Sequence, residues 1–172
     1  MEDGIYCQTS DAEPGESESI AVSYIDGMSL SIDTRLVEGF SHMGREIFFS
    51  DGADNTLRLT YVGHLNKLIY SSTVGGVMIY SDFIVPPEEE WDGSDGLWHN
   101  LKIEMYGDTI QAFRDDILLF EDIDPLYLGF PTTGNIHLYS WDSHTCFDNV
   151  VFLSEGAVAA QNETWTQVKI QY

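Results

Sequence analysis

The stretch that decides the fold is Gly96-Leu-Trp-His-Asn-Leu-Lys-Ile-Glu-Met-Tyr-Gly-Asp-Thr-Ile-Gln-Ala-Phe-Arg-Asp-Asp-Ile-Leu-Leu-Phe-Glu121. Within it, Leu101, Ile103 and Met105 alternate with polar residues, which is the period of a strand with one buried and one solvent-facing side. Gly107-Asp108 and Asp115-Asp116 interrupt the alternation with residues that tolerate turn conformations. The stretch therefore predicts three strands joined by two tight turns.

The rest of the chain repeats this pattern of short apolar stretches separated by Gly, Asp, Ser and Pro. No segment has the length and period of an amphipathic helix. We expect further strands at 20–25, 28–32, 47–49, 57–62, 67–70, 76–85, 135–141, 147–152 and 164–172. Asp26-Gly27 predicts a hairpin between the first two of these strands. About a dozen strands without a helix predict an all-β fold, a two-sheet antiparallel β-sandwich or jelly roll.

The length of 172 residues is sufficient for one domain with its own hydrophobic core. We expect residues 20–172 to form a single β-sandwich domain. Residues 1–19 are expected to be a leader segment that is flexible or loosely draped on it. No internal repeat at a fixed period is present, which excludes a solenoid or a propeller.

The charge is strongly unbalanced, with 7 basic against 29 acidic residues and a net charge of −22. Such a surface repels nucleic acid and anionic lipid, and it attracts cations. No apolar run reaches the roughly 18 residues of a membrane span, so neither nucleic-acid binding nor membrane insertion is expected. Three causes would each produce this acidity: a saline habitat, bound calcium, or selection for solubility.

The order of motifs after residue 96 carries a family resemblance. Trp98-His99, a strand, a Gly-Asp turn, a strand, an Asp-Asp turn and a strand are followed by Gly134-Asn-Ile-His-Leu-Tyr-Ser-Trp-Asp142 and Cys146-Phe-Asp-Asn-Val-Val-Phe152. This order resembles the second half of concanavalin A-like and laminin-G-like jelly-roll domains, over residues 96–153. The superfamily includes lectins, adhesion modules, polysaccharide-binding modules and glycosidases. The resemblance therefore implies the fold and leaves the activity open.

Sugar binding requires exposed aromatic rings that stack on the C–H faces of a sugar, together with amides or carboxylates that bind its hydroxyls. Trp91 and Trp141 lie in or beside predicted loops and have the acidic neighbours Asp92 and Asp142. Tyr139 alternates with Trp141 and is expected to share its face. We therefore predict ligand-binding residues at Trp91, Trp141, Tyr139 and Asp142.

The alternative for these aromatics is the hydrophobic core, where most aromatic residues of a sandwich lie. Trp98 opens a predicted strand and is interpreted as a core or rim anchor. Arg45, Arg58 and Arg114 are candidates for bidentate hydrogen bonds to a ligand, or for relief of repulsion between acids.

Calcium binding is predicted from two loops in which acids alternate with glycine, 51–55 and 90–95, because Ca²⁺ takes six to eight oxygen ligands. The family resemblance adds an acid on the last strands, which in carbohydrate-binding jelly rolls often helps to hold a structural calcium ion. The predicted ligands are Asp51, Asp54, Asn55, Asp92, Asp95 and Asp148. The alternative is that these residues form turns without any metal.

No catalytic residue is predicted. A glycosidase needs two carboxylates on one face, about 5–10 Å apart, and no strand carries acids with the matching spacing. The nearest candidate, Glu90-Trp-Asp-Gly-Ser-Asp95, has the glycine content of a loop. His144 lies near Cys146, and we interpret this as chance proximity rather than as a thiol–imidazole pair.

Cys7 and Cys146 lie near opposite ends of the chain. Sandwich folds often bring terminal strands together, so the two cysteines either form a disulfide or are two separate buried thiols. The extracellular character of the sequence favours the disulfide.

These observations favour a non-catalytic module, lectin-like or adhesive, that is secreted or held at the cell surface. Its expected partner is a glycan or an extracellular protein. One alternative is a structural subunit of an extracellular filament, sheath or coat, which would assemble with copies of itself. The other is a glycoside hydrolase of the same fold.

Overall fold

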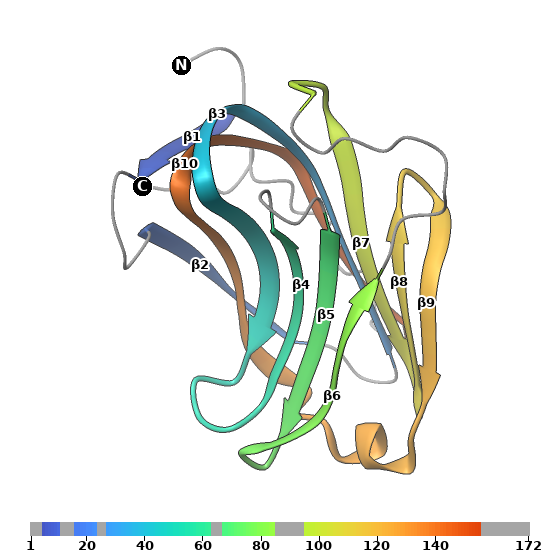
Figure 1. Ribbon diagram of the computed structural model, residues 1–172. Helices are drawn as coiled ribbons and strands as arrows, with labels where there is room; N and C mark the ends of the chain where they lie inside the picture. Colours follow the sequence, from blue (N-terminus) through green and yellow to red (C-terminus); the bar gives the residue numbers. More distant parts are fainter. Residues whose placement is uncertain (1–4, 11–15, 24–26, 63–66, 85–94, 156–172) are drawn as a thin grey trace.

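The computed structural model describes residues 5–10, 16–23, 27–62, 67–84 and 95–155. Over these residues the chain forms ten strands and one short 3₁₀ helix, η2 (Pro125–Gly129) (Figure 1). The strands are β1 (Tyr6–Ser10), β2 (Glu16–Ser23), β3 (Gly27–Ser50), β4 (Thr56–Val62), β5 (Lys67–Val74), β6 (Val77–Ile84), β7 (His99–Tyr106), β8 (Thr109–Arg114), β9 (Ile117–Ile123) and β10 (Thr133–Glu155).

Two long strands, β3 and β10, pass from one layer of the fold to the other (Figure 1). The first sheet contains β6, β5 and β4, the second half of β3 and the first half of β10. The second sheet contains β9, β8 and β7, the first half of β3 and the second half of β10. β1 and β2 pair with β10 on its other edge. Every ladder is antiparallel, which confirms the predicted two-sheet antiparallel jelly roll.

The core lies between the two sheets and is built from the alternating apolar residues of the strands. In β7, Leu101, Ile103 and Met105 are buried, as their alternation with polar residues predicts. Tyr70 of the first sheet stacks on Phe120 of the second, with ring centroids 5.0 Å apart. Each fully buried aliphatic or aromatic side chain stabilises the fold by roughly 1.5–3 kcal/mol. Burial between the layers is therefore the main source of stability.

One end of the sandwich is closed by η2. The Asp124 side chain accepts a hydrogen bond from the backbone N–H of Leu126 at 2.9 Å and so caps this short helix. The cap turns Tyr127 into the space between the sheets, where its hydroxyl donates to Asp122 Oδ2 at 2.8 Å and lies 3.4 Å from Ser72 Oγ. Because Ser72 is on β5, the helix links the end of β9 to the first sheet.

The two tight turns of the deciding stretch form where the sequence predicts them. Gly107 has a φ of 60°, and Asp115 and Asp116 have φ values of 49° and 63°. Glycine adopts the left-handed region without strain, and aspartate tolerates it better than most residues do. The turns therefore connect β7 to β8 and β8 to β9 as two hairpins.

The described strands on either side of Asp26-Gly27 do not pair with each other, in contrast to the predicted hairpin. β2 pairs with β10, whereas the start of β3 pairs with β7 and with β10, so β2 and β3 share no ladder. The predicted strands 28–32 and 47–49 are parts of the single strand β3, and 135–141 and 147–152 are parts of β10. The turn signal was local, but the pairing was decided by partners distant in sequence.

The predicted leader, residues 1–19, contains β1 and the start of β2, and both strands are hydrogen-bonded to β10. The described part of residues 1–19 is therefore part of the sheets, and not the loosely attached leader that the sequence predicts. The physical reason is that β10 offers an edge with unpaired backbone groups, which these strands satisfy. The expected strand 164–172 lies outside the described residues. Among the described residues, none belongs to a helix with the length and hydrophobicity needed to span a bilayer.

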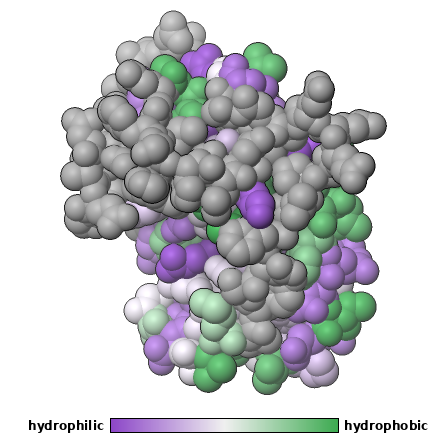
Figure 2. All heavy atoms as spheres, viewed as in Figure 1, coloured by the Kyte–Doolittle hydropathy of each residue, from purple (hydrophilic) through white to green (hydrophobic). Residues whose placement is uncertain are grey.

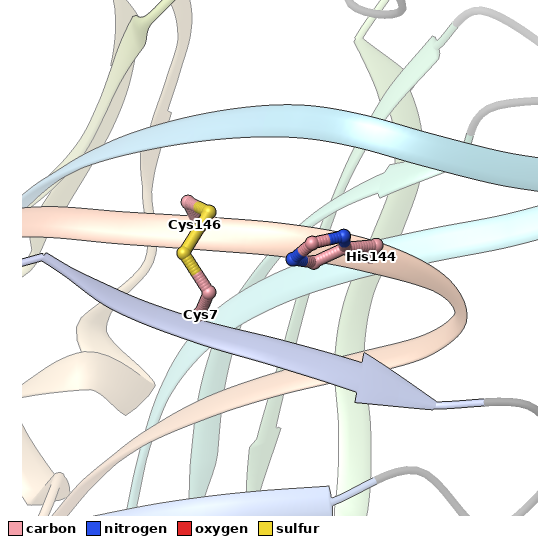
Figure 3. A group of neighbouring side chains, drawn as sticks. All are labelled: Cys7, His144 and Cys146. Carbon is pink, nitrogen blue, oxygen red and sulfur yellow. A yellow bond between two sulfur atoms is a disulfide. The ribbon is translucent and has the colours of Figure 1, made fainter. Parts of the chain in front are cut away.

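The two cysteines join the first described strand to the last. Cys7 on β1 and Cys146 on β10 are register partners and form a disulfide with an S–S distance of 2.04 Å (Figure 3). Of the two alternatives left open by the sequence, the structure contains the disulfide. A bridge that closes a loop of this length typically stabilises a fold by about 2–5 kcal/mol.

Gly134 provides a test of the close approach of β10 to β3. A Cβ atom at this position would lie 2.5 Å from the carbonyl oxygen of Ser50 and 2.6 Å from the ring of Phe49. We expect Gly134→Ala to lower the free energy of unfolding by about 1–3 kcal/mol, the usual cost of overpacking. The control is Gly129→Ala, because a Cβ there meets no atom within 4 Å. Equal urea midpoints for the two variants would contradict the predicted crowding.

Candidate ligand-binding face

The outer face of the first sheet carries a group of aromatic, charged and hydroxyl side chains. The alternation that buries Ile47 on β3, Leu59 on β4 and Leu138 on β10 turns their sequence neighbours outward. The strand register places these neighbours side by side across the three strands. The outer-face cluster consists of Glu46, Phe48, Arg58, Thr60, His137 and Tyr139.

A stack of three flat groups forms the centre of this cluster. The rings of Phe48 and His137 are parallel within 5°, and their centroids are 4.3 Å apart. The guanidinium carbon of Arg58 lies 4.9 Å from the centroid of Phe48. Such cation–π contacts contribute about 0.5–1 kcal/mol at exposed sites. The stack therefore holds an arginine, with a side chain 42% exposed, in a fixed place on the sheet.

Glu46 is the carboxylate of the cluster, and its side chain is only 9% exposed. The Thr60 hydroxyl donates a hydrogen bond to Glu46 Oε2 at 2.9 Å, and Arg58 Nη1 lies 3.6 Å from Glu46 Oε1. Burial raises the pKa of Glu46 above 4.5, and this effect outweighs the opposite influences of Arg58 and Thr60. Loss of hydration around the carboxylate thus has the largest influence on whether Glu46 is charged.

His137 is half-buried, and its pKa is lowered from 6.5, first by burial and second by the positive charge of Arg58. At neutral pH the imidazole is therefore uncharged, with one nitrogen that donates and one that accepts a hydrogen bond. Together with the hydroxyls of Thr60 and Tyr139, the cluster presents neutral hydrogen-bonding groups beside an aromatic stack.

Most of the predicted ligand-binding residues cannot be compared with this cluster. Trp91 lies outside the described residues, as does Asp92 of the calcium prediction. Trp141 and Asp142 are on β10 where it bends from one sheet to the other, and their side chains lie outside the description. Tyr139 is half-buried on the outer face, opposite Glu46 in the register. Trp98 is half-buried under the guanidinium of Arg35 at 4.8 Å, as expected of a rim residue.

The three candidate arginines lie in different parts of the fold. Arg58 belongs to the outer-face cluster, but Arg45 is 1% exposed and stacks on Tyr61 at 4.6 Å inside the sandwich. Burial lowers the pKa of Arg45 to about 10. Arg114 is also buried, and burial lowers its pKa as well. Arg58 is thus the candidate arginine that is available to a ligand.

Phe48, Glu46 and His137 were not predicted as site residues. A signal for Phe48 and His137 exists in the sequence, because each lies between two buried apolar residues and is therefore turned outward. Glu46 follows the buried Arg45 and has an apolar neighbour, Ile47, on one side. Their proximity, however, depends on the pairing of β3 with β10, which no local pattern reveals.

The predicted calcium loop 51–55 forms a turn with internal hydrogen bonds. Asp51 Oδ1 accepts from the backbone N–H groups of Ala53 and Asn55, and Asp51 Oδ2 accepts from Asn55 Nδ2 at 2.6 Å. These bonds, that from Asn55 first, lower the pKa of Asp51. Asn55 Oδ1 accepts from the backbone N–H of Gly75 at 2.9 Å. The oxygens expected to bind calcium therefore stabilise the turn itself.

Two other described acids from the calcium prediction, Asp95 and Asp148, also accept hydrogen bonds. Asp95 accepts from the backbone N–H of Leu97 at 2.7 Å, and its Oδ1 lies 3.2 Å from His99 Nε2. Asp148 accepts from the backbone N–H of Asn149 at 2.8 Å. In the described part of the chain, none of these acids belongs to a group of three or more His, Cys, Asp or Glu side chains with converging ligand atoms. Calcium binding stays a prediction.

No family model matches the sequence, and no curated protein matches it either. Solved structures with the same fold are found. They include the carbohydrate-binding module CBM66 from Bacillus subtilis, with 18% identity, a TM-score of 0.57, and coverage of 90% of this chain and 84% of that one. A Bacillus licheniformis β-glucanase has 12% identity and a TM-score of 0.62, over 88% of this chain and 78% of the other. Sheep galectin-11 has 14% identity and a TM-score of 0.55, over 79% of this chain and 96% of the other.

These similarities confirm that the chain has the concanavalin A-like jelly-roll fold that its motifs resemble. At such low identities they establish the fold alone.

The calcium prediction is tested by comparing two salts. A specific site would raise the melting temperature in millimolar CaCl₂ above that in NaCl of the same ionic strength, and a chelator would reverse the effect. Relief of self-repulsion among the acids would raise it equally in both salts. Equal melting temperatures without a chelator effect would remove calcium as a cofactor.

Glu46 gives a prediction about pH. Because its pKa is raised in the folded state, the folded protein holds this proton where the unfolded chain has lost it. The contribution of Glu46 to stability is therefore present below pH 4.5 and is lost as the pH rises through the folded-state pKa. Glu46→Gln does not titrate and keeps a partner for Thr60.

We expect the free energy of unfolding of Glu46→Gln, relative to the parent protein, to increase as the pH is raised from about 4 to 7. Urea unfolding across this range measures the difference. Glu121→Gln, at an exposed acid on β9, is the control and should give a flatter difference. A difference for Glu46→Gln that does not change with pH would contradict the raised pKa.

Proposed function

We propose that this domain binds a carbohydrate on the outer-face cluster and does not cleave it. The observation that carries the proposal is the stack of Phe48, His137 and Arg58 beside Glu46 and Thr60. A sugar ring has an apolar C–H face and a rim of hydroxyls. The stack supplies aromatic surface for the first, and the guanidinium, imidazole and hydroxyl groups supply hydrogen bonds for the second.

The net charge narrows the class of glycan. A chain with a net charge of −22 repels uronic acids, sulfated sugars and other anionic polysaccharides at a distance. Arg58 does not reverse this repulsion, because Glu46 lies 3.6 Å from it. The proposed ligand is therefore a neutral glycan.

Binding without cleavage is supported by the number of carboxylates. Glycoside hydrolysis uses two carboxyl groups about 5–10 Å apart. Among the described side chains of the outer face, Glu46 is the one carboxylate, and Arg58 and Thr60 bind it. The β-glucanase neighbour shares the fold, but this face provides no described second acid for its chemistry.

We also propose that the protein is secreted or held at the cell surface, with a glycan or an extracellular protein as its partner. The disulfide supports this setting, because such bonds persist in oxidising compartments.

Self-assembly into a filament or coat has less support. The exposed large hydrophobic residues of the described chain are spread over β3, β6, β7, β9, β10, η2 and the segment before β7. On the face drawn in Figure 2, hydrophobic residues are mixed with hydrophilic ones.

The proposal is tested with Phe48→Ala and Arg58→Ala. A screen against neutral and anionic glycans identifies a ligand, and titration calorimetry measures its affinity. We expect each substitution to weaken binding by at least about tenfold, equivalent to 1.4 kcal/mol.

The matched control is Gln111→Ala on the outer face of the second sheet, which should leave the affinity unchanged. Circular dichroism verifies that the variants are folded. Arg58→Ala is the safer of the two substitutions, because the Arg58 side chain is 42% exposed and lies on the outer face. Unchanged affinity in Arg58→Ala would show that the glycan binds elsewhere and would overturn the proposed site. A parent protein that binds no glycan would overturn the proposed function and favour the assembly alternative.

A further inference from the structure

His144 of β10 lies beside the disulfide that joins β1 to β10 (Figure 3). β1 and β10 run antiparallel, with Cys7 opposite Cys146 and Thr9 opposite His144. Because His144 and Cys146 are two residues apart on a strand, their side chains leave β10 on the same side. The two sulfur atoms and one imidazole nitrogen all lie within 4.8 Å of one another. His144 and Cys146, whose proximity in the sequence we interpreted as chance, are thus also neighbours in space.

This group has the composition and nearly the dimensions of a zinc site. Zn²⁺ is bound tetrahedrally by thiolates at about 2.3 Å and by imidazole at about 2.0–2.1 Å, which places neighbouring ligand atoms about 3.5–3.8 Å apart. The imidazole nitrogen lies within 4.8 Å of both sulfur atoms, and the sulfur atoms, which are bonded to each other in the disulfide, can move apart toward this separation once the bond is broken. Two cysteines and one histidine are ligands that zinc prefers and calcium does not.

We propose that reduction of the Cys7–Cys146 disulfide creates a Zn²⁺ site formed by Cys7, His144 and Cys146. A dithiol reductant supplies two electrons and two protons, the S–S bond breaks, and the reductant becomes its own disulfide. Zn²⁺ then displaces both thiol protons and bonds to two thiolates and to the neutral imidazole. Water completes the four-coordinate shell.

The position of the group suits this exchange. Cys7 is exposed, so a reductant reaches its sulfur, whereas Cys146 is 2% exposed and stays within the fold. The metal would tie β1 to β10 at the same place as the disulfide does. The acidic surface, with its net charge of −22, raises the local concentration of divalent cations. The inference is independent of the proposed carbohydrate binding, since the outer-face cluster contains none of these three residues.

The test compares oxidised and reduced protein with Co²⁺ as a spectroscopic substitute for Zn²⁺. The parent protein is reduced with dithiothreitol, transferred to anaerobic buffer without reductant and titrated with CoCl₂. We expect one Co²⁺ per chain, a thiolate-to-cobalt charge-transfer band, visible bands of tetrahedral cobalt, and displacement of Co²⁺ by ZnCl₂. The oxidised protein should show none of these bands. Zn²⁺ should also raise the melting temperature of the reduced protein, but not that of the oxidised protein.

The decisive variant is His144→Ala, because it keeps the disulfide and can be shown to fold before reduction. Loss of a direct ligand should weaken Co²⁺ binding by at least about tenfold, since even loss of an outer-shell partner costs that much. Asn135→Ala, at a half-buried polar residue of β10 far along the strand from Cys146, is the control and should bind Co²⁺ as tightly as the parent protein.

Two results would overturn the proposal. One is that the reduced parent protein shows no charge-transfer bands when Co²⁺ is added. This holds if the reduced protein stays folded, and also if it unfolds and Zn²⁺ does not refold it. The other is His144→Ala that binds Co²⁺ as tightly as the parent, which would show that the cysteines bind metal without this histidine.

Discussion

The structure depends on the pairing of β3 with β10. Each of these strands runs through both sheets, and the two are register partners from Asn135 and Ser50 at one end to Glu155 and Gly27 at the other. Four further strands attach directly to this pair: β4 and β7 to β3, and β1 and β2 to β10. A sandwich assembled on one central ladder keeps the two layers in a fixed relation, because the same backbone crosses between them.

The register of that ladder also creates the outer-face cluster. Side chains alternate between the faces of a strand, so a slip of one residue would move Ile47 and Leu138 out of the core and turn Phe48 and His137 into it. The burial of the apolar set therefore fixes which residues face outward. The cross-strand contact of Phe48 with His137, with ring centroids 4.3 Å apart, follows from the same register. Core packing and site geometry are two consequences of one pairing.

The few cations of this acidic chain occupy particular positions. Arg35 lies over Trp98, Arg45 over Tyr61, Arg58 over Phe48 and Lys102 over Phe113. In each contact the aromatic ring offers its negative face to a positive charge. Lys102 and Arg58 also approach carboxylates, Glu104 at 3.2 Å and Glu46 at 3.6 Å. The cations therefore serve packing as well as relief of repulsion between acids.

The sequence by itself determined the strand content, the inward residues and the turns. Leu101, Ile103 and Met105 are inward because their period is that of a strand, and Gly107 and Asp115-Asp116 turn the chain because these residues tolerate positive φ. These are local properties, set by side-chain size and backbone freedom, and a local pattern is sufficient to read them. The motif order after residue 96 added the jelly-roll topology by resemblance.

Only the tertiary structure decided which strands pair. The sequence suggested a hairpin at Asp26-Gly27, but β2 lies beside β10 and β3 beside β7. The hydrogen bonds that Asp51 accepts within its own turn are also visible only in the structure. Phe48 with His137, and His144 with Cys7, are brought together by ladders between distant segments. Pairing between distant strands depends on the burial of the whole core, and no short stretch of sequence contains that information.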